Sequence, residues 1–226
     1  MITVHHLEHS RSERVLWLLE ELGIEYTVKR YPRDPKTSLA PPELRAIHPL
    51  GKAPIITDGD VTVAESGAIL EYLTGTYGKG AFVPPAATEA YRQYIYWLHF
   101  AEGSLMPYLV MKLVFTRIDH APMPFFVKPI ARQITSKVRS GFLDPNLENT
   151  LNFIEAHLAR NAWFAGEEFS AADIQMAFPL TGAMTRATKS GQYPSIVAFL
   201  ERVKARPAYQ RAETKGGAFG PMDRKP

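Results

Sequence analysis

The stretch that decides the fold is Leu50-Gly-Lys-Ala-Pro-Ile-Ile-Thr-Asp-Gly-Asp-Val-Thr-Val-Ala-Glu-Ser-Gly-Ala-Ile-Leu70. It predicts a loop ending at Pro54, two short strands joined by a turn at Asp58-Gly59, and a helix that begins at Ser66. A proline at the start of a strand cannot donate to a sheet, so the chain before it keeps backbone groups for another partner. The N–H groups at a helix N-terminus favour a carboxylate. Together these features indicate a site for a small extended peptide with charged ends.

The residues upstream predict a strand, a helix and a second strand. Ile2–Leu7 and Tyr26–Tyr31 have the composition of strands. Between them, Ser10 and Glu13 have the spacing of a capping box, with Ser10 as the N-cap, and Gly23 marks the helix end. A short helix is expected near Glu43, and the hairpin strands are expected at 55–57 and 62–64. This order, β-α-β-(α)-β-β-α, is the thioredoxin-like arrangement.

The pattern changes after the proline- and glycine-containing stretch Gly78–Pro85, which reads as a linker between domains. We therefore expect a thioredoxin-like α/β domain over residues 1–78 and an all-helical domain over residues 86–226. Apolar residues at three- and four-residue spacing predict the helices of the second domain. These are Tyr91 to about Met111, Ile130–Arg139, Asn146–Leu158, a helix capped by Ser170 and Asp173 that runs through Leu180, and Ile196–Arg206, which Pro207 stops. The tail from Lys215 is expected to be poorly ordered.

The composition of the chain argues against several classes of protein. The chain has 226 residues, a net charge of +3 and no cysteine. Its basic residues form no cluster of the kind that binds nucleic acid, and no apolar run approaches the roughly 20 residues that span a bilayer. We expect neither a nucleic-acid nor a membrane partner. No signal peptide precedes the first strand, which makes the cytoplasm the default location. The absence of cysteine excludes disulfides, thiolate metal sites and a protein thiol nucleophile.

Several motifs, weak singly, carry a resemblance to a known family when taken in their order and spacing. They are Ser10-Arg-Ser-Glu-Arg-Val-Leu-Trp-Leu-Leu-Glu-Glu-Leu-Gly23, His48-Pro-Leu-Gly-Lys-Ala-Pro54, Glu65-Ser66 and Phe169-Ser-Ala-Ala-Asp173. The chain resembles the cytosolic glutathione transferases, in their serine-type microbial branch, from about Ile2 to Tyr209. The resemblance implies glutathione as co-substrate, a role in detoxification and a two-fold homodimer.

The resemblance also implies how glutathione is held. Ala53, before a cis Pro54, would pair with the cysteinyl backbone as an added strand does. Glu65 would accept from the γ-glutamyl amino group, and Ser66 with its helix N–H groups would hold the γ-glutamyl carboxylate. Lys52 is the expected partner of the glycyl end. Plain helix capping is the structural alternative for Glu65 and Ser66.

Glutathione must also be activated, because a thiol with a pKa near 8.5 is only about 3% ionised at pH 7. Family members use tyrosine, serine or cysteine for this task. No tyrosine precedes Tyr26 and cysteine is absent, so serine remains. Ser10 is our first candidate, with its hydroxyl proton pointing at the sulfur while its oxygen caps the helix. Ser12 is the second candidate, and Arg11 could assist by its charge.

Three histidines near the N-terminus, His5, His6 and His9, suggest a metal or a general base. His5 and His6 alternate in direction along a strand and no carboxylate cluster accompanies them, so we read them as ordinary strand and loop residues and expect no metal.

The electrophile is expected in an apolar cleft between the domains, against the long helix, where Phe100, Ser104 and Tyr108 share one face. The expected reaction is conjugation of the glutathione thiolate to a hydrophobic electrophile. A glutathione-dependent disulfide or peroxide reductase is the alternative within enzymes. A non-catalytic transferase-like binding module is the alternative outside them.

Overall fold

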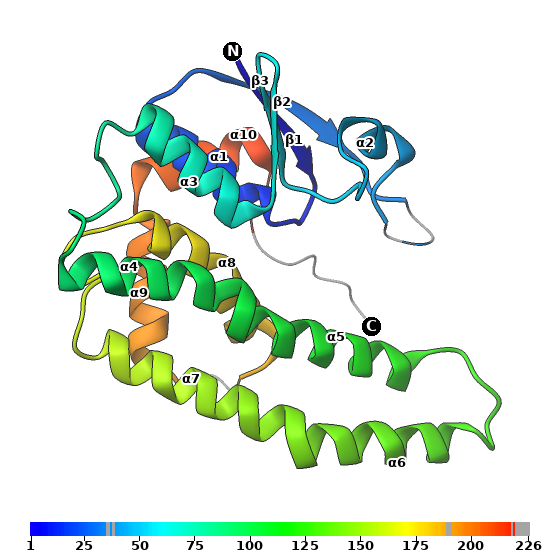
Figure 1. The fold of residues 1–226 in the computed structure, drawn as a ribbon. Helices are drawn as coiled ribbons and strands as arrows, with labels where there is room; N and C mark the ends of the chain where they lie inside the picture. The colour runs from blue at the N-terminus through cyan, green and yellow to red at the C-terminus, as the bar shows by residue number, and fades with distance from the viewer. Residues whose placement is uncertain (35–36, 38, 189–190, 218, 220–226) are drawn as a thin grey trace.

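The computed structural model describes residues 1–34, 37, 39–188, 191–217 and 219, and its architecture is drawn in Figure 1. The elements follow in the order β1 (Ile2–Leu7), α1 (Ser12–Leu22), β2 (Tyr26–Tyr31), α2 (Pro42–Ile47), β3 (Ile55–Asp58), β4 (Val61–Ala64), α3 (Ser66–Tyr77), α4 (Glu89–Phe100), η1 (Ala101–Leu105), α5 (Met106–His120), α6 (Lys128–Val138), η2 (Arg139–Leu143), α7 (Asp144–Leu158), α8 (Ala171–Arg186), α9 (Pro194–Lys204) and α10 (Pro207–Gly216).

The N-terminal half is a thioredoxin-like α/β unit, as the sequence predicts. Its four strands have the order β2-β1-β3-β4. β1 and β2 are parallel, whereas β3 is antiparallel to both β1 and β4. α2 covers one face of the sheet, where Leu44 packs with Leu7, Tyr31 and Ile55. α1 and α3 cover the other face and also contact α8 of the helical half, so a single apolar core continues from the sheet into the helices.

The helical half has two long rods, each longer than the sequence predicts. α4, η1 and α5 form one continuous helix to His120, and α6, η2 and α7 form a second. The prediction of a break after Arg139 is wrong, because the π-helical turn η2 carries the chain through to Pro145, which occupies the first turn of α7. Proline is tolerated there, since the first-turn N–H groups have no partner within the helix.

One helix, α10, has no counterpart among the helices expected from the sequence. Pro207 does end α9, but it also occupies the first turn of α10, which packs against α1 (Figure 1). The tail predicted to be poorly ordered therefore begins inside this helix. Its residues 218 and 220–226 lie outside the described residues.

The capping box at the start of α8 is confirmed. The Asp173 carboxylate accepts from the Ser170 backbone N–H at 2.8 Å and from the Ser170 hydroxyl at 2.9 Å. Its second oxygen accepts from the backbone N–H of Phe164 at 2.8 Å, which ties the preceding loop to the helix. Burial raises the pKa of Asp173 to about 6 against the opposing effect of these hydrogen bonds.

Candidate functional site

Strand pairing brings the predicted site residues to one edge of the sheet. His5 of β1 pairs with Ile55 of β3, and Ile55 pairs in turn with Ala64 of β4. The end of β1, the residues before β3 and the residue after β4 therefore lie side by side. The three segments separated in the sequence, around Ser10, Pro54 and Glu65, meet there.

The loop before β3 has the geometry that the resemblance implies. The Ala53–Pro54 peptide bond is cis. Pro54 is buried and Ala53 is half-buried just outside the strand. Lys52 is exposed, and its ammonium makes no hydrogen bond or ion pair with the residues the structure describes. Its charge is thus open to an anionic ligand.

Glu65 stands at the N-cap of α3 in a conformation that non-glycine residues seldom adopt, with φ 73° and ψ 127°. Its side chain is exposed, and its carboxylate has no hydrogen-bond or ion-pair partner among the described residues. Backbone strain of this kind concentrates at functional sites, where the surrounding structure holds it in place.

The hydroxyl of Ser66, the first residue of α3, has its acceptor capacity filled by two buried donors. It accepts from Arg14 Nη1 at 3.0 Å and from Gln175 Nε2 at 3.1 Å. A hydroxyl has two lone pairs and one proton, so the proton of Ser66 is left to donate. The first N–H groups of α3 lie beside it without partners within the helix. Several donors therefore converge at this point, which suits a carboxylate.

Arg14 connects the two halves of the molecule and was missed by the sequence analysis. Its side chain is 1% exposed, and its guanidinium bonds Glu102 of η1 at 2.5 Å and lies over the ring of Phe178. Burial lowers the pKa of Arg14 to about 10, against the opposing effect of Glu102, so the side chain remains charged at neutral pH. Arg11 bonds the same carboxylate at 3.0 Å. Burial raises the pKa of Glu102, but Arg14 and Arg11 outweigh it and lower the value.

The capping box predicted from Ser10 to Glu13 does not form. α1 begins at Ser12, and Arg11, with helical dihedral angles and no side-chain cap bond, occupies the N-cap position. The Ser10 hydroxyl instead accepts from the Ser12 N–H at 3.2 Å and contacts the Ser12 hydroxyl at 2.7 Å. The left-handed turn at His9 precedes this arrangement and delays the start of the helix.

His6 extends the hydroxyl pair into a chain of hydrogen bonds, so its reading as an ordinary strand residue is incomplete. Its Nε2 lies 2.9 Å from the carbonyl of Gly216 in α10, and its Nδ1 lies 2.7 Å from the Ser12 hydroxyl. A carbonyl only accepts, so Nε2 carries the ring proton. Burial lowers the pKa of His6, which keeps the ring neutral and leaves Nδ1 as an acceptor. The Ser12 hydroxyl has one proton and two acceptors within reach, the Leu7 carbonyl at 3.3 Å and Nδ1 at 2.7 Å. We assign the proton to the nearer Nδ1, so Ser10 donates to Ser12.

The three residues predicted to line the electrophile cleft lie on the rod formed by α4, η1 and α5. Phe100 packs with Trp97 and with Phe153 of α7, and Tyr108 packs with Phe142 of η2. Glu102, on the same rod, turns instead to α1. Ser104 is half-buried in η1. Aromatic residues on a helix commonly face its packing partner, which is what Phe100 and Tyr108 do.

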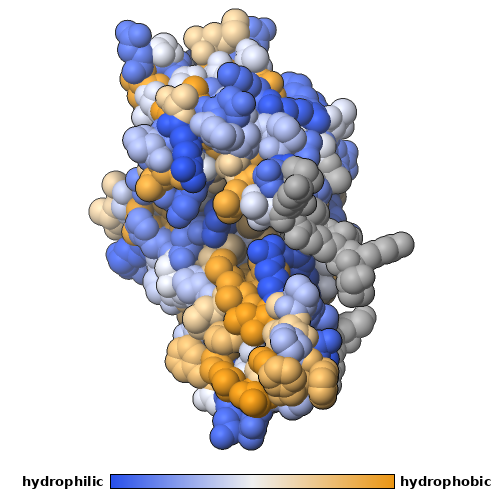
Figure 2. Space-filling model, turned by 90° about the vertical axis from the view of Figure 1, so that its right-hand side faces the viewer, coloured by the Kyte–Doolittle hydropathy of each residue, from blue (hydrophilic) through white to orange (hydrophobic). Residues whose placement is uncertain are grey.

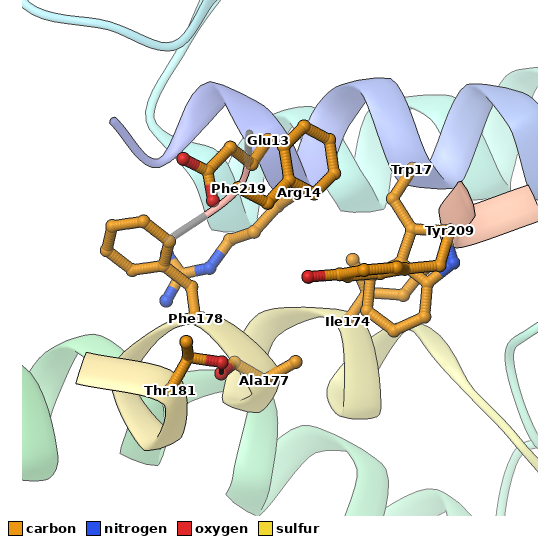
Figure 3. Close-up of a pocket in the computed structure, with 9 residues that line it drawn as sticks. All are labelled: Glu13, Arg14, Trp17, Ile174, Ala177, Phe178, Thr181, Tyr209 and Phe219. Carbon is orange, nitrogen blue, oxygen red and sulfur yellow. Dashed lines mark hydrogen bonds between the residues drawn. The ribbon is translucent and has the colours of Figure 1, made fainter. Parts of the chain in front are cut away.

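A small cavity of about 20 Å³ lies between α1, α8 and α10. Figure 3 shows Glu13 and Arg14 reaching it from α1 and the Tyr209 hydroxyl pointing into it from α10. Arg14 Nε and Nη2 make no hydrogen bond within the described residues. This volume and these donors suit a single water molecule and are too small for an organic reactant.

Two kinds of feature are absent from the described part of the chain. It contains no group of three or more His, Asp or Glu side chains arranged to hold a metal ion. It also contains no helix that combines the length and the apolar composition needed to cross a bilayer.

Comparison with known proteins gives consistent matches. The family model "Glutathione S-transferase, N-terminal domain" matches residues 1–75, and "Glutathione S-transferase, C-terminal domain" matches residues 123–207. Glutathione S-transferase 3 of Schizosaccharomyces pombe is 40% identical over 216 residues, which is 95% of this chain and 88% of the relative. The chain belongs to the glutathione S-transferase family.

Other family members agree over the full length. Glutathione S-transferase 1 of Saccharomyces cerevisiae is 32% identical over 97% of each chain. The crystal structure of a glutathione S-transferase from Actinobacillus pleuropneumoniae superposes with a TM-score of 0.79 at 33% identity, covering 97% of this chain and 94% of that one. A relative with a different name, disulfide-bond oxidoreductase YfcG of Escherichia coli, is 27% identical over 95% of each chain.

Proposed function

We propose that this family member binds glutathione at the edge formed by Ala53, Pro54, Glu65 and Ser66, and conjugates its thiolate to a hydrophobic electrophile. The hydrogen bonding of Ser66 carries this proposal. Because Arg14 and Gln175 fill its acceptor sites, its proton is available to a carboxylate such as that of the γ-glutamyl group. The exposed Glu65 carboxylate, one residue away, suits the neighbouring amino group, and Lys52 suits the glycyl carboxylate.

Ser10 is the residue that we propose to activate the thiol. With neutral thiol in the site, Ser10 donates to Ser12 and keeps one lone pair for the S–H. When the sulfur loses its proton to solvent, Ser10 turns its O–H from Ser12 to the thiolate, because a hydrogen bond to an anion is stronger than one to a neutral hydroxyl. Lowering a thiol pKa by two units requires roughly 2.7 kcal/mol, to which this exchange and the positive end of α1 contribute.

We place the electrophile between the two halves, beside the pair of Arg11 and Glu102. Phe100, Ser104 and Tyr108, on the same rod as Glu102, are the residues that we propose to line its pocket. The domain boundaries at residues 78 and 86 and the two-fold homodimer remain part of the proposal. Light scattering at micromolar concentration tests the dimer, since a monomer would contradict it.

A glutathione-dependent disulfide reductase is the second candidate. A relative named as a disulfide-bond oxidoreductase favours it, as does the absence of cysteine, which would leave a second glutathione to resolve the mixed disulfide. Turnover of a chlorodinitrobenzene-type substrate, compared with turnover of a small organic disulfide, separates the two reactions. Negligible turnover of both would contradict an enzymatic role and favour a non-catalytic binding module.

Retention on immobilised glutathione tests the binding site directly. We expect Glu65→Ala to abolish retention, because the amino group of the ligand loses its acceptor. Glu168→Ala, which removes an exposed carboxylate from another loop, is the matched control and should be retained like the original chain. Equal retention of Glu65→Ala would contradict the proposed site.

A further inference from the structure

The connection between α5 and α6 exposes two large aromatic side chains to solvent. Phe125 is 84% exposed and Phe126 is 65% exposed. Figure 1 shows this connection at the far end of the two rods, extended from the rest of the molecule. Apolar side chains that are exposed together in this way usually mark a binding surface.

The apolar surface continues from the connection along both helices. On α5 and α6 a set of aliphatic side chains is exposed with helical spacing, and we call these residues together with Phe125 and Phe126 the hairpin tip. The set consists of Val110, Leu113, Val114, Ile118, Ile130 and Ile134. Figure 2, which views the molecule from this end, shows apolar side chains gathered over its lower part.

The same hairpin concentrates the positive charge of the chain. Residues 106–143 contain six Lys or Arg and one acidic residue, a net charge of +5, whereas the other 188 residues carry a net charge of −2. The single carboxylate, Asp119, is bonded to Arg139. Four exposed cations have no ion pair among the described residues. They are Arg117, Lys128, Arg132 and Lys137.

We propose that the hairpin tip docks on the surface of an anionic lipid bilayer, with Phe125 and Phe126 entering the interface and the surrounding cations contacting headgroups. Aromatic side chains favour the membrane interface, and Lys and Arg can extend their charges to the lipid phosphates. Amphipathic surfaces with a basic rim bind anionic lipids by combining buried apolar area with electrostatic attraction.

The positive charge of the hairpin favours an anionic bilayer over a second copy of this chain, and its apolar side chains favour a bilayer over nucleic acid. A two-fold contact between copies of the tip would bring two hairpins of +5 together, which is unfavourable. Nucleic acid would satisfy the cations but would leave the aliphatic side chains without an apolar partner. The expectation of no membrane partner rested on the lack of a spanning segment, and docking on a surface needs none.

Sedimentation of the full-length chain with vesicles tests the proposal and requires no substrate. One set of vesicles contains phosphatidylcholine alone, and the other contains about 30% phosphatidylserine. We expect binding to the anionic vesicles that weakens as salt is raised. The double variant Phe125→Ser/Phe126→Ser and the double variant Lys128→Glu/Arg132→Glu should each lower the partition coefficient about tenfold or more.

Val197→Ser, which removes an exposed apolar side chain from α9, is the matched control and should bind like the original chain. Because all the substituted side chains are exposed, circular dichroism and the melting temperature should not change. Absence of binding, equal binding to both vesicle types, or unchanged binding by both double variants would overturn the proposal. So would conversion of a dimer to a monomer by Phe125→Ser/Phe126→Ser, because the tip would then be an interface between copies.

Discussion

In the hydrogen bond between the Ser10 and Ser12 hydroxyls either group can be the donor. Which group donates determines whether Ser10 has a proton free for the sulfur of glutathione. The sequence predicts that the Ser10 proton points at the sulfur of bound glutathione. Without that ligand, the neutral ring of His6 accepts the proton of Ser12, and Ser12 accepts that of Ser10. The thiolate must therefore compete with Ser12 for the Ser10 proton. A longer relay, in which a proton passes through both hydroxyls to His6, would form an imidazolium at a position where burial disfavours it.

Ser10→Ala is expected to raise the pKa of the bound thiol by one unit or more, which corresponds to about 1.4 kcal/mol. Turnover at neutral pH should fall roughly tenfold or more with little change in glutathione affinity, because transition-state stabilisation is lost. Ultraviolet absorption of the thiolate across a pH series measures the pKa.

Ser12→Ala is the control for this experiment and should affect the thiol pKa less, since it removes the acceptor that competes for the Ser10 proton, while His6 Nδ1 loses its donor. If Ser12→Ala and His6→Phe raise the thiol pKa as much as Ser10→Ala does, the relay operates and the proposed rotation of Ser10 is wrong.

Glu102→Gln should destabilise the chain by roughly 3 kcal/mol or more, because it leaves the charge of the buried Arg14 without a carboxylate. Urea unfolding measures this loss. Glu89→Gln removes an exposed partner of Arg92 on α4 and should cost less than about 1 kcal/mol. Equal losses in the two variants would contradict the bridging role of Arg14.

At the residue scale, the sequence predicted the groups that are adjacent in the chain and missed those that meet only in space. Pro54, Glu65 and Ser66 were found because each has a local signature, a proline before a strand or an acceptor and hydroxyl before a helix. Arg14 and Glu102 are separated by 88 residues, and His6 meets Gly216 across 210 residues. No spacing within the sequence predicts such pairs, because they depend on how the two halves pack.

At the scale of elements, the π turns explain why helix limits were predicted poorly while helix identity was predicted well. Periodicity of 3.6 residues locates the apolar face, and the helix predicted from Tyr91 to about Met111 runs through η1, but at η2 the turn of different pitch coincides with the predicted break after Arg139. η1 also carries Glu102, the carboxylate that reaches Arg11 and Arg14. Turns of this kind occur frequently at functional sites.

Gly216→Ala tests the contact between α10 and the site. An added Cβ would lie 2.6 Å from Leu16 Cδ1 and 2.9 Å from Phe219 Cε1, so these side chains or α10 must shift, and a shift of α10 would carry the carbonyl that binds His6. We expect a loss of about 1–3 kcal/mol from overpacking. Nitrogen chemical shifts of the His6 ring should also move, as the Nε2 partner changes.

Gly182→Ala in α8 is the matched control, because nothing lies within 4 Å of its added Cβ. It should leave stability equal or slightly raised, as alanine favours a helix over glycine. A neutral Gly216→Ala with unchanged ring shifts would show that α10 does not position His6.

At the scale of the whole molecule, buried histidines link stability to pH. Burial lowers the pKa of His5, His6 and His157 below the value of 6.5 that applies in the unfolded chain. Between those lowered values and about 6.5 the unfolded chain binds more protons, so stability is lost as pH falls, by up to about 1.4 kcal/mol per pH unit for each group.

The contribution of Asp173 to the pH dependence of stability has the opposite sign. Its pKa of about 6 in the folded chain exceeds the unfolded value of 3.8, so folding takes up a proton below pH 6 and stability rises as pH falls. The histidine effect should therefore dominate above pH 6. We expect the melting temperature to fall between pH 7.5 and about pH 6 at constant ionic strength. His157→Gln should reduce that slope, and a melting temperature that rises with acidification would contradict this account.

The position of Arg14 also limits how the two halves can move. Its charge is held by Glu102 on one side and by Ser66 on the other, with the ring of Phe178 beside it. Any rotation about residues 79–88 that separates the halves would break these contacts and leave a desolvated cation with fewer partners. These contacts therefore oppose separation of the two halves. A ligand that binds between the halves must then be accommodated with the Arg14 contacts intact, because opening the molecule would cost the pairing of a buried charge.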